Sequence, residues 1–550
     1  MPKNNKDTRN VMTLRDYLTL NPGLLIKLLC LPILAVITSP VLAAENCEGV
    51  SPTPSLEESY SEGWGIDHRN RRYQTRSLIN ADNAGSLSLK WVYGLSHEQP
   101  RSFPYITEDT VFIGDSNHGL VALERETGCE RWVYEFDGII TSAILAGVID
   151  DRQVLIFAAR FSGVYIVDAL EGTLVRHLTL EEEPIPLYSG TPLVADDLIF
   201  VPIASMEIGL SANPFYGCCT TSGGMAAFNM ATGDLRWYLP TIEEEAKVTG
   251  SHFFFVQEHG PSGAPVWGAP AYDEERDLVF YGTGQNYTHP TTKTSDAIFA
   301  VDASTGKARW VVQFTENDAF SAACNMSMNH PNCAKPTGPD LDFGAPTLLT
   351  RTPSGVDLLL AGQKSGDIYA MNPDTGAVLW SKRLGRGGII GGVHWGLSVN
   401  EALGLVFVPI SDKQVMGFPT PGVPTPGLYA LDIETGEQRW HYSRESRCAD
   451  EECTYGLSGA ITATNDIVVT GNMDGKLEIH SALTGELIWT HDSWRDYEAT
   501  NGLPVNGGSF DAHGPMIADD LLLVTSGYQY VGSQRGGNAL LVFQLDASDE

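Results

Sequence analysis

A short unit recurs seven times along the chain, and this repeat limits the possible folds more than any other feature. Each copy has an alternating apolar segment, a turn that contains glycine, and a second segment that ends in tryptophan or an apolar substitute; "IFAVDASTGKARW" and "LYALDIETGEQRW" are two examples. Alternation with period two indicates a strand, and the glycine supplies the positive φ that a tight hairpin needs. The seven glycines stand at positions 128, 172, 233, 306, 376, 436 and 485.

The spacing of the repeats predicts an all-β protein, an eight-bladed β-propeller. Successive glycines are 44, 61, 73, 70, 60 and 49 residues apart, which is too long for one hairpin but suits four-stranded blades with insertions. Seven repeats give seven blades. Two fragments are left over, "LSLKWVYGL" near the start and "NALLVFQLD" at the end. We expect the two termini to complete the eighth blade together, because this closure removes exposed sheet edges.

The first 43 residues have the pattern of a secretory signal peptide. A basic leader precedes the apolar run "LLCLPILAVITSPVLA" and the small residues Ala43 and Ala44. The run is too short to predict a membrane span, and no later segment qualifies. The chain therefore divides into a signal peptide at 1–43, an N-terminal extension at 44–85 and a propeller at 86–550. We expect a soluble protein exported to the periplasm.

The charge and the cysteines of the exported part are also informative. Without residues 1–43 the chain keeps 30 basic and 66 acidic residues, a net charge of about −36, which disfavours nucleic acid and anionic membranes as partners. Eight cysteines remain, an even number that suits an oxidising compartment. Proximity in the sequence suggests three pairs and leaves a fourth, which would tie the amino terminus to the first blade: Cys218–Cys219, Cys324–Cys333, Cys448–Cys453 and Cys47–Cys129.

The repeated hairpin resembles the tryptophan-docking repeat of quinoproteins that use pyrroloquinoline quinone (PQQ). The resemblance covers nearly all of the exported chain and is strongest with the polyvinyl alcohol dehydrogenase branch of PQQ-dependent alcohol dehydrogenases. It rests on an ordered set of segments: "VWGAPAYDEERDLVFYGTGQNY", "GPDLDFGAP", "AGQKSGDIYAMN", "GGVHWGLS" and "NGLPVNGGSFDAHGP". It implies a cofactor in the central funnel of the propeller, over a tryptophan floor and beside a calcium ion or a lanthanide.

The family pattern also implies the metal ligands, which for calcium are oxygen atoms. The segment "ASMEIGL" looks like the family's metal-binding segment and nominates Glu207. The family's asparagine after Gly-Thr-Gly falls at Gln285, with Asn286 next to it, and either amide could supply the oxygen. Asp340 and Asp342 complete the expected set. An isolated Asp-x-Asp is usually a solvated turn, but two carboxylates on one face of a strand repel each other unless a cation or a shared proton intervenes.

The same acidic segment provides the expected catalytic base. "PDLDFGAP" resembles the segment in which the first aspartate accepts the substrate proton, which assigns this role to Asp340. Asp342 matches the additional aspartate with which some alcohol dehydrogenases bind a lanthanide. Many relatives have an aspartate in a segment like "TENDAFSA", and here that position is Ser321. Asp318, in the same segment, is therefore the alternative base.

A further group of residues matches positions that bind or line the quinone. Trp267 would stack on it, and Lys364 would stabilise the charge that develops on a quinone oxygen. An arginine stands where many relatives have a cofactor-binding acid, and it could pair with a cofactor carboxylate instead. The expected cofactor-binding residues are Trp267, Lys364, Ser189, Thr191, His394, Trp395 and Arg101. His394 could equally be a core histidine, and Cys218–Cys219 could cap the funnel or stiffen a loop.

The resemblance implies oxidation of an alcohol to a carbonyl compound with PQQ as electron acceptor, and the branch it resembles implies secondary alcohols, including polymeric ones such as polyvinyl alcohol. Asp340 would take the hydroxyl proton, and the metal ion would act as a Lewis acid. The sequence has no Cys-x-x-Cys-His motif for a c-type haem, so we expect a separate periplasmic cytochrome c to accept the electrons. The alternative is a propeller that kept the repeat without the cofactor and acts as an assembly scaffold.

Overall fold

The computed structural model describes residues 47, 49–97, 99–413, 420–445, 447, 454–529 and 534–546. The expected pair Cys448–Cys453 lies outside these residues. The other three expected disulfides, Cys47–Cys129, Cys218–Cys219 and Cys324–Cys333, are present. Within the described part of the chain, no helix is both long and apolar enough to cross a membrane.

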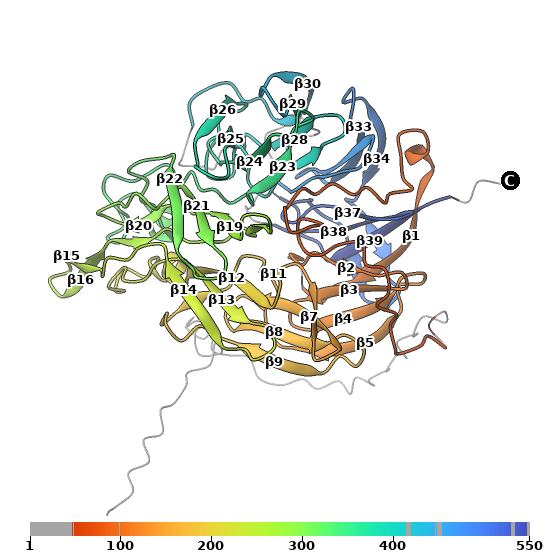
Figure 1. Cartoon of the computed structure of the whole chain (residues 1–550), viewed down its shortest axis with the longest axis horizontal. Coiled ribbons are helices and arrows are strands. Elements are labelled where there is room, and N and C mark those ends of the chain that lie inside the picture. The colour runs from red at the N-terminus through yellow and green to blue at the C-terminus, as the bar shows by residue number, and fades with distance from the viewer. Residues whose placement is uncertain are drawn as a thin grey trace, which may run out of the picture. The chain divides into compact units, whose positions relative to one another are not determined.

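The described residues form eight antiparallel blade sheets, seven with four strands and one with five, and the fold predicted from the repeat is confirmed. The sheets follow one another around a ring in the order of the chain (Figure 1). The first four are blade 1, with β2 (Tyr105–Ile106), β3 (Thr110–Asp115), β4 (Gly119–Glu124) and β5 (Glu130–Glu135); blade 2, with β6 (Leu145–Ile149), β7 (Arg152–Ala159), β8 (Gly163–Asp168) and β9 (Leu174–Leu178); blade 3, with β11 (Leu193–Ala195), β12 (Leu198–Ser205), β13 (Gly224–Asn229) and β14 (Leu235–Pro240), and with β10 (Pro186–Leu187) also paired to β12; and blade 4, with β18 (Ala271–Asp273), β19 (Leu278–Gly282), β21 (Ala297–Asp302) and β22 (Ala308–Gln313).

The remaining blades continue the ring, and the last one joins the two ends of the propeller. They are blade 5, with β23 (Leu348–Arg351), β24 (Asp357–Gly362), β25 (Asp367–Met371) and β26 (Val378–Arg383); blade 6, with β27 (Ser398–Asn400), β28 (Leu405–Ile410), β29 (Gly427–Asp432) and β30 (Gln438–Ser443); blade 7, with β31 (Thr462–Ala463), β32 (Ile467–Gly471), β33 (Lys476–Ser481) and β34 (Leu487–Asp492); and blade 8, with β37 (Met516–Ala518), β38 (Leu521–Ser526), β39 (Ala539–Leu545) and β1 (Leu87–Gly94). Strand β1 pairs with β39 from Leu87–Leu545 to Gly94–Ala539. Both termini therefore complete the eighth blade, as the leftover fragments predicted.

The two signature residues of the repeat meet across the boundaries between blades. Gly306, at φ +72°, lies on the ring of Trp237 from the preceding blade, so close that a Cβ would be 2.5 Å from it. The indole N–H of Trp237 donates to Ala303 O in the same turn. Where the preceding repeat ends without tryptophan, Arg176 lies against the glycine, Gly233. The repeat is thus a docking contact as well as a hairpin turn, because only a glycine admits the ring.

The hydrophobic core lies in layers between neighbouring blades. Phe280 of β19 and Leu359 of β24, for example, belong to one buried cluster. Inner strands are buried on both faces because a blade covers each side, whereas the outermost strand of each sheet is partly exposed. This explains why β28 reads as the continuous apolar run "LVFVPI" and β30 as the mixed run "QRWHYS".

The segment before β1 crosses the propeller and contacts several blades. It includes the short helix η2 (Ala84–Ser86). Asn70 Nδ2 donates to the backbone of blades 4 and 5, at Pro270 O and Thr347 O. The fully buried Arg72 donates to Ile461 O, which precedes blade 7.

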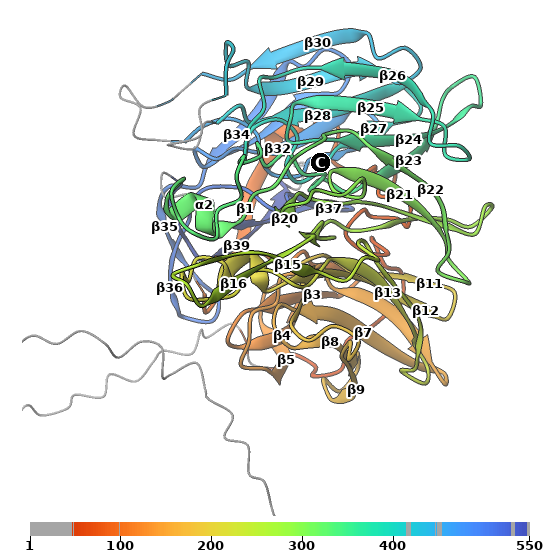
Figure 2. The same cartoon turned by 90° about the vertical axis from the view of Figure 1, so that its left-hand side faces the viewer.

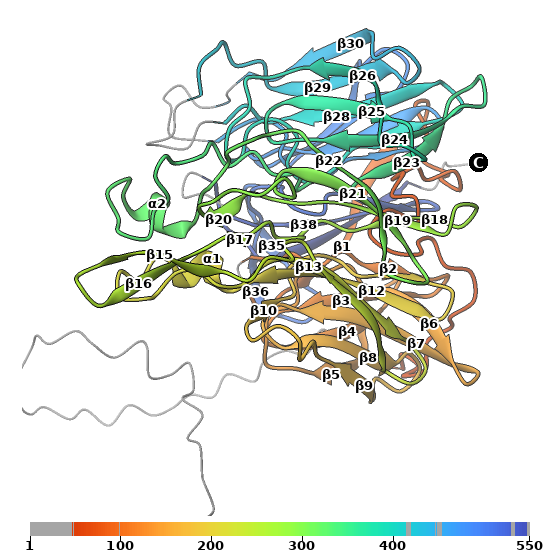
Figure 3. The same ribbon diagram turned by 60° about the vertical axis from the view of Figure 1, so that its left-hand side comes forward.

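Insertions in blades 3, 4 and 5 build the surface around the funnel. Helix α1 (Glu207–Leu210) follows β12, α2 (Ala322–Met326) follows β22, and β15 (Lys247–His252) forms a hairpin with β16 (Val256–Gly260). Figures 2 and 3 both show α2 and the β15–β16 hairpin on one side of the propeller. The remaining elements are the pairs β17 (Ser262–Gly263) with β20 (Asn286–Thr288) and β35 (Asp496–Glu498) with β36 (Pro504–Asn506).

Candidate active site

A cavity of about 310 Å³ lies where the blades converge. Residues of seven of the eight blades, among those that the structure describes, line it, and only the axis of the ring is accessible to so many blades. The cavity brings together nine residues predicted for the site: Arg101, Ser189, Trp267, Gln285, Asp340, Asp342, Lys364, His394 and Trp395. Thr191, Glu207 and Asn286 are not among its lining residues.

Two recurring positions within a blade supply these side chains. The first is the loop before the innermost strand: Trp267 precedes β18, Asp340 and Asp342 precede β23, and His394 precedes β27. The second is the end of the next strand, which places Gln285 after β19 and Lys364 after β24. Equivalent ends of the blades point to one axis, so residues far apart in sequence meet there.

The sequence interpretation missed several lining residues. Arg160 follows β7 directly, and Tyr528 follows the end of β38 by two residues, so both occupy the second recurring position. A search for polar residues after the second strand of each repeat would have found them. Asn325 and Ile208 lie on the insertions α2 and α1, where the repeat gives no signal.

Lys364 lies between the two acids of the Asp-x-Asp segment. Its ammonium nitrogen is 3.1 Å from Asp340 Oδ1 and 3.0 Å from Asp342 Oδ2, and all three side chains are buried. Opposite charges this close in a buried site attract strongly. The repulsion between the acids, which the sequence interpretation assigned to a metal ion or a shared proton, is relieved here by a side chain of the protein.

Asp342 also orients the neighbouring groups. Its Oδ2 accepts a hydrogen bond from the indole N–H of Trp267 at 3.0 Å, and its Oδ1 accepts one from the backbone N–H of Gln285 at 3.0 Å. The carboxylate thus connects blades 4 and 5. Because these donors and Lys364 already engage both of its oxygens, Asp342 fixes the positions of Trp267 and Lys364.

Asp318 holds the loop that carries Asp340. The Asp318 carboxylate accepts hydrogen bonds from the backbone N–H groups of Asp340, at 3.0 Å, and Leu341, at 2.8 Å. Asp340 has a φ of +59°, in the left-handed region, and this conformation directs its side chain to the cavity that it lines. Asp318 is buried and does not line the cavity, so the geometry makes it a support for Asp340.

Burial is the largest influence on the pKa values of Asp340 and Asp318. It raises the pKa of Asp340 to about 8, a shift that Lys364 opposes and that Asp342 and Asp318 increase. Burial likewise raises the pKa of Asp318 to about 6, although the hydrogen bonds that it accepts from two backbone N–H groups lower this pKa. A carboxyl group with a pKa near neutrality can both take up and release a proton at physiological pH, as a general base must.

Aromatic rings form a wall of the cavity. Trp267 and Trp395 are perpendicular, with ring centroids 5.6 Å apart, and the Arg101 guanidinium lies 4.7 Å from the centroid of Trp395. Arg101 also donates to Ser189 O at 3.0 Å. His394 contacts Trp267 at 5.8 Å and shares a 2.8 Å hydrogen bond with Ser458. Burial and the nearby cations Lys364 and Arg101 lower the pKa of His394, so its ring is neutral.

The two candidate amides differ in their surroundings. Gln285 Oε1 is buried and has no hydrogen-bond partner among the described residues, while its Nε2 donates to Phe320 O. The amide of Asn286 is occupied: Nδ2 donates to Ser262 O, and Oδ1 accepts from the backbone N–H of Thr292. Of the two, Gln285 therefore has the oxygen that could bind a cation. Thr191 is similarly occupied, since its hydroxyl accepts from Ala143 N–H at 3.0 Å.

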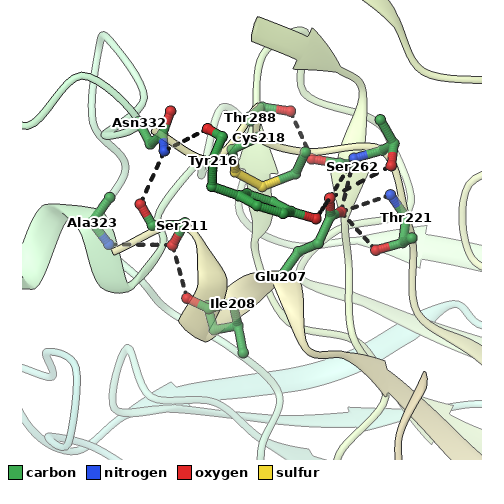
Figure 4. The surroundings of a disulfide bond; sticks show 12 residues. Glu207, Ile208, Ser211, Tyr216, Cys218, Thr221, Ser262, Thr288, Ala323 and Asn332 are labelled. Carbon is green, nitrogen blue, oxygen red and sulfur yellow. Dashed lines mark hydrogen bonds between the residues drawn. A yellow bond between two sulfur atoms is a disulfide. The ribbon is translucent and has the colours of Figure 1, made fainter. Parts of the chain in front are cut away.

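Glu207 lies in a separate, fully buried environment. Its carboxylate accepts hydrogen bonds from the Tyr216 hydroxyl, from the backbone N–H groups of Thr220 and Thr221, and from the Thr221 hydroxyl (Figure 4). The disulfide Cys218–Cys219 directly precedes the two threonines. Neither cysteine lines the cavity, so the disulfide constrains the loop that binds Glu207 and does not cap the cavity.

The side chains in the cavity fit the quinone and the cation that the family resemblance implies. Lys364 and Arg101 offer positive charge to an acceptor that carries carboxylates and carbonyl oxygens, and Trp267 offers a ring face. The orphaned Gln285 Oε1 and the Asp340 carboxylate offer oxygen ligands, which calcium prefers. No group of three or more His, Cys, Asp and Glu side chains in the described part of the chain could hold a metal ion.

Comparisons with known proteins agree with this architecture. The family described as glucose/ethanol/alcohol dehydrogenase, β-propeller domain (PQQ), matches residues 62–382, and the one described as outer membrane protein assembly factor BamB matches residues 296–538. The quinohemoprotein alcohol dehydrogenase of Comamonas testosteroni has a TM-score of 0.65 at 17% identity, with 90% of this chain and 81% of that chain covered. A europium-containing methanol dehydrogenase has a TM-score of 0.63 at 15% identity, with 90% and 98% covered. These two likenesses concern the fold.

One relative carries the assignment to a branch of the family. The polyvinylalcohol dehydrogenase of Sphingopyxis sp. (strain 113P3) is 30% identical over 526 residues, which cover 92% of this chain and 79% of the relative. The family match over residues 62–382 runs from the segment before blade 1 almost to the end of blade 5, and so includes Trp267, Asp340 and Lys364. The chain belongs to the PQQ-dependent quinoprotein alcohol dehydrogenases and, within them, to the polyvinyl alcohol dehydrogenase branch.

Proposed function

We propose that this protein oxidises secondary alcohols, including the hydroxyl groups along a polymer such as polyvinyl alcohol, to ketones in the periplasm. The observation that carries the proposal is the arrangement of Asp340, Lys364 and Trp267 from two neighbouring blades around one cavity. The polyvinylalcohol dehydrogenase relative supports the choice of substrate.

Asp340 is the group that receives the hydroxyl proton of the substrate. It lines the cavity, and Lys364 Nζ, 3.1 Å away, stabilises its charged form. When bound, PQQ supplies the two-electron acceptor for the hydride of the alcohol carbon. Lys364 and Arg101 provide fixed positive charge toward oxygen atoms in the cavity, and Trp267, held by Asp342, restricts the orientation of a flat ligand.

We propose that a calcium or lanthanide ion binds beside Asp340, with Gln285 Oε1 as the amide ligand. Gln285 is favoured over Asn286 because its amide oxygen has no partner among the described residues. Asp342 remains a candidate ligand for a lanthanide, although Lys364, Trp267 and Gln285 N–H now engage its oxygens. Glu207 could bind the ion only if it gave up hydrogen bonds to Thr220 and Thr221.

The electrons are proposed to leave to a separate periplasmic cytochrome c, because the sequence offers no Cys-x-x-Cys-His motif. The test uses protein incubated with PQQ and calcium. We expect a bound-quinone absorbance spectrum and reduction of an artificial electron acceptor that depends on pentane-2,4-diol or polyvinyl alcohol. A spectrum identical to that of free PQQ, together with no dye reduction by any alcohol, would support the assembly-scaffold alternative instead.

A further inference from the structure

An exposed apolar surface lies beside the cavity and plays no part in the arrangement described above. It consists of six residues, which we call the apolar rim: Phe215, Phe253, Phe254, Phe255, Met326 and Met328. Phe254 is fully exposed, and Phe255 is 71% exposed. Contiguous exposed apolar residues on a soluble protein commonly mark a binding surface.

Specific contacts hold the rim together. Phe215 and Phe253 have ring centroids 5.5 Å apart, and His252, in the hairpin, contacts Pro214 O at 2.8 Å. Asn332, which follows α2, donates to the backbone of the loop after α1, at Asn213 O and Tyr216 O. Figure 3 shows α1, α2 and the β15–β16 hairpin together on one side of the propeller. The three insertions therefore form one continuous surface.

The rim begins at the edge of the cavity. Ile208 and Gly209 of α1 line the cavity, and the exposed Leu210 follows them directly. On the other insertion Asn325 of α2 lines the cavity, and Met326, 70% exposed, is the next residue. A long ligand with one end in the cavity would pass over these residues on its way out.

The tip of the hairpin has residues that its backbone geometry does not favour. Phe253 and Phe254 have φ values of +49° and +67°, in the left-handed region where Gly, Asn and Asp are the least strained residues. Phenylalanine there costs conformational energy, and the side chain of Phe254 is fully exposed, so burial within this chain does not offset the cost. A ligand that covers the rings would provide the missing contacts.

The chemistry of the hairpin indicates what covers it. A groove along the hairpin is lined by apolar Val248, Phe254 and Phe255 and by uncharged Thr249, Ser251 and Gln257. It has no charged side chain, although the whole chain has a net charge of −33. The lining thus combines apolar and uncharged hydrogen-bonding groups, the two kinds of contact that a hydrocarbon chain with hydroxyl groups can make. The groove itself offers no charged side chain to a charged partner or an anionic membrane.

We propose that the apolar rim and the β15–β16 hairpin bind the part of a polymeric secondary alcohol that extends out of the cavity, while one of its hydroxyl groups lies at Asp340. This inference rests on the proposed function. It makes the rim a determinant of specificity for long substrates, and small alcohols that fit within the cavity do not use it.

The test compares Phe254→Ser/Phe255→Ser with the matched control Leu174→Ser/Leu483→Ser, which removes two exposed leucines from blades 2 and 7. The first measurement is migration in native gels that contain polyvinyl alcohol, which needs no cofactor. We expect the polymer to retard the wild type and the control, and the apparent Kd of the rim variant to rise about tenfold or more, a loss typical of two central aromatic contacts.

The second measurement is steady-state kinetics of the enzyme reconstituted with PQQ and calcium. For the rim variant we expect kcat/KM for the polymer to fall about tenfold, mainly through KM, while kcat/KM for pentane-2,4-diol stays unchanged. If the wild type oxidises neither alcohol, the proposed function is wrong, and the gels still test polymer binding. The inference is overturned if the rim variant keeps wild-type migration and polymer kinetics, if it loses activity on the small diol equally, or if the wild type binds phosphatidylcholine vesicles or a second copy of itself but no polymer.

Discussion

The ammonium nitrogen of Lys364 lies 3.1 Å from Asp340 Oδ1, in a cavity where both side chains are almost fully buried. Two opposing effects act on the pKa of the Asp340 carboxyl in this position. Burial raises the pKa of its carboxyl, and Lys364 favours the charged form. A base in such a site is held near the protonation equilibrium that proton transfer requires, without exposure to bulk water.

If Asp340 is the proton acceptor, Asp340→Asn should slow turnover strongly and leave the cofactor bound. Asparagine keeps an oxygen for the cation but has no basicity, so we expect kcat to fall about 10²- to 10⁴-fold. Single-turnover reduction of the bound quinone by a secondary alcohol measures this step, on protein whose quinone spectrum shows full loading. Asp318→Asn is the comparison: its carboxylate accepts two backbone N–H groups and does not line the cavity, so a smaller loss, near tenfold, is expected. A wild-type rate in Asp340→Asn together with an inactive Asp318→Asn would show that the alternative base is the correct one.

Removal of Lys364 should make the protein depend on an added cation. Lys364→Met leaves Asp340 and Asp342 buried side by side without a compensating charge, and loss of one partner from a buried ion pair typically costs about 3 to 5 kcal/mol. We therefore expect a lower Tm in chelator and a larger rise of Tm on addition of calcium than the wild type shows. Lys307→Met, on an exposed hairpin, is the control and should change neither value. An unchanged Tm in chelator would mean that Lys364 contributes little to the folded state.

The sequence predicted the ring of blades because the glycine of one repeat docks on the tryptophan of the repeat before it, and both residue types are visible in the repeat. Gly306 and Trp237, for example, are signature residues of successive repeats, and they meet in the structure. Closure by the termini was also predictable, since "LSLKWVYGL" and "NALLVFQLD" were the two strands without a blade. Part of the cavity lining was also predictable from the sequence, because residues at equivalent strand ends converge on the axis of the propeller.

The orientation of individual side chains in the site was not predictable. Gln285 and Asn286 are neighbours, and only the structure shows that Thr292 occupies the amide oxygen of Asn286. Glu207 matched a metal-binding segment, but hydrogen bonds from Thr220 and Thr221, which follow it by more than ten residues, decide where its carboxylate lies. The position of Lys364 between two acids depends on the packing of blade 4 against blade 5, which no local pattern encodes.

Gly344 should be essential for the position of Trp267. A Cβ on Gly344 would lie 1.9 Å from Cη2 of the Trp267 ring, so Gly344→Ala must displace the indole and break its hydrogen bond to Asp342. We expect a marked loss of PQQ affinity, measured by titration of the quinone absorbance, and a destabilisation of about 1 to 3 kcal/mol, as is typical of overpacking. Gly85→Ala, where no atom lies within 4 Å of the added Cβ, is the matched control. Equal PQQ affinity in both variants would contradict a stacking role for Trp267.

The last prediction concerns Asp296, a fully buried acid near the site whose two carboxylate oxygens have no hydrogen-bond partner among the described residues. Burial, followed by the charges of Asp318 and Asp342, raises its pKa well above the ordinary value. The folded protein therefore keeps a proton that the unfolded chain releases above about pH 4. The free energy of unfolding must fall as pH rises from there toward the pKa of the folded state, by about 1.4 kcal/mol per pH unit.

Asp296→Asn removes this penalty, because the amide has nearly the shape of the protonated acid and cannot ionise. In urea titrations of the cation-free protein, we expect the variant to be more stable than the wild type at pH 7.5 and the difference to shrink toward zero at pH 4.5. Glu274→Gln, an exposed acid on blade 4, should leave the stability unchanged at both values. If Asp296→Asn destabilised the protein at pH 7.5, the prediction would be wrong. The Asp296 carboxylate would then be charged in the folded state and stabilised by a neighbouring cation, and it would not retain its proton.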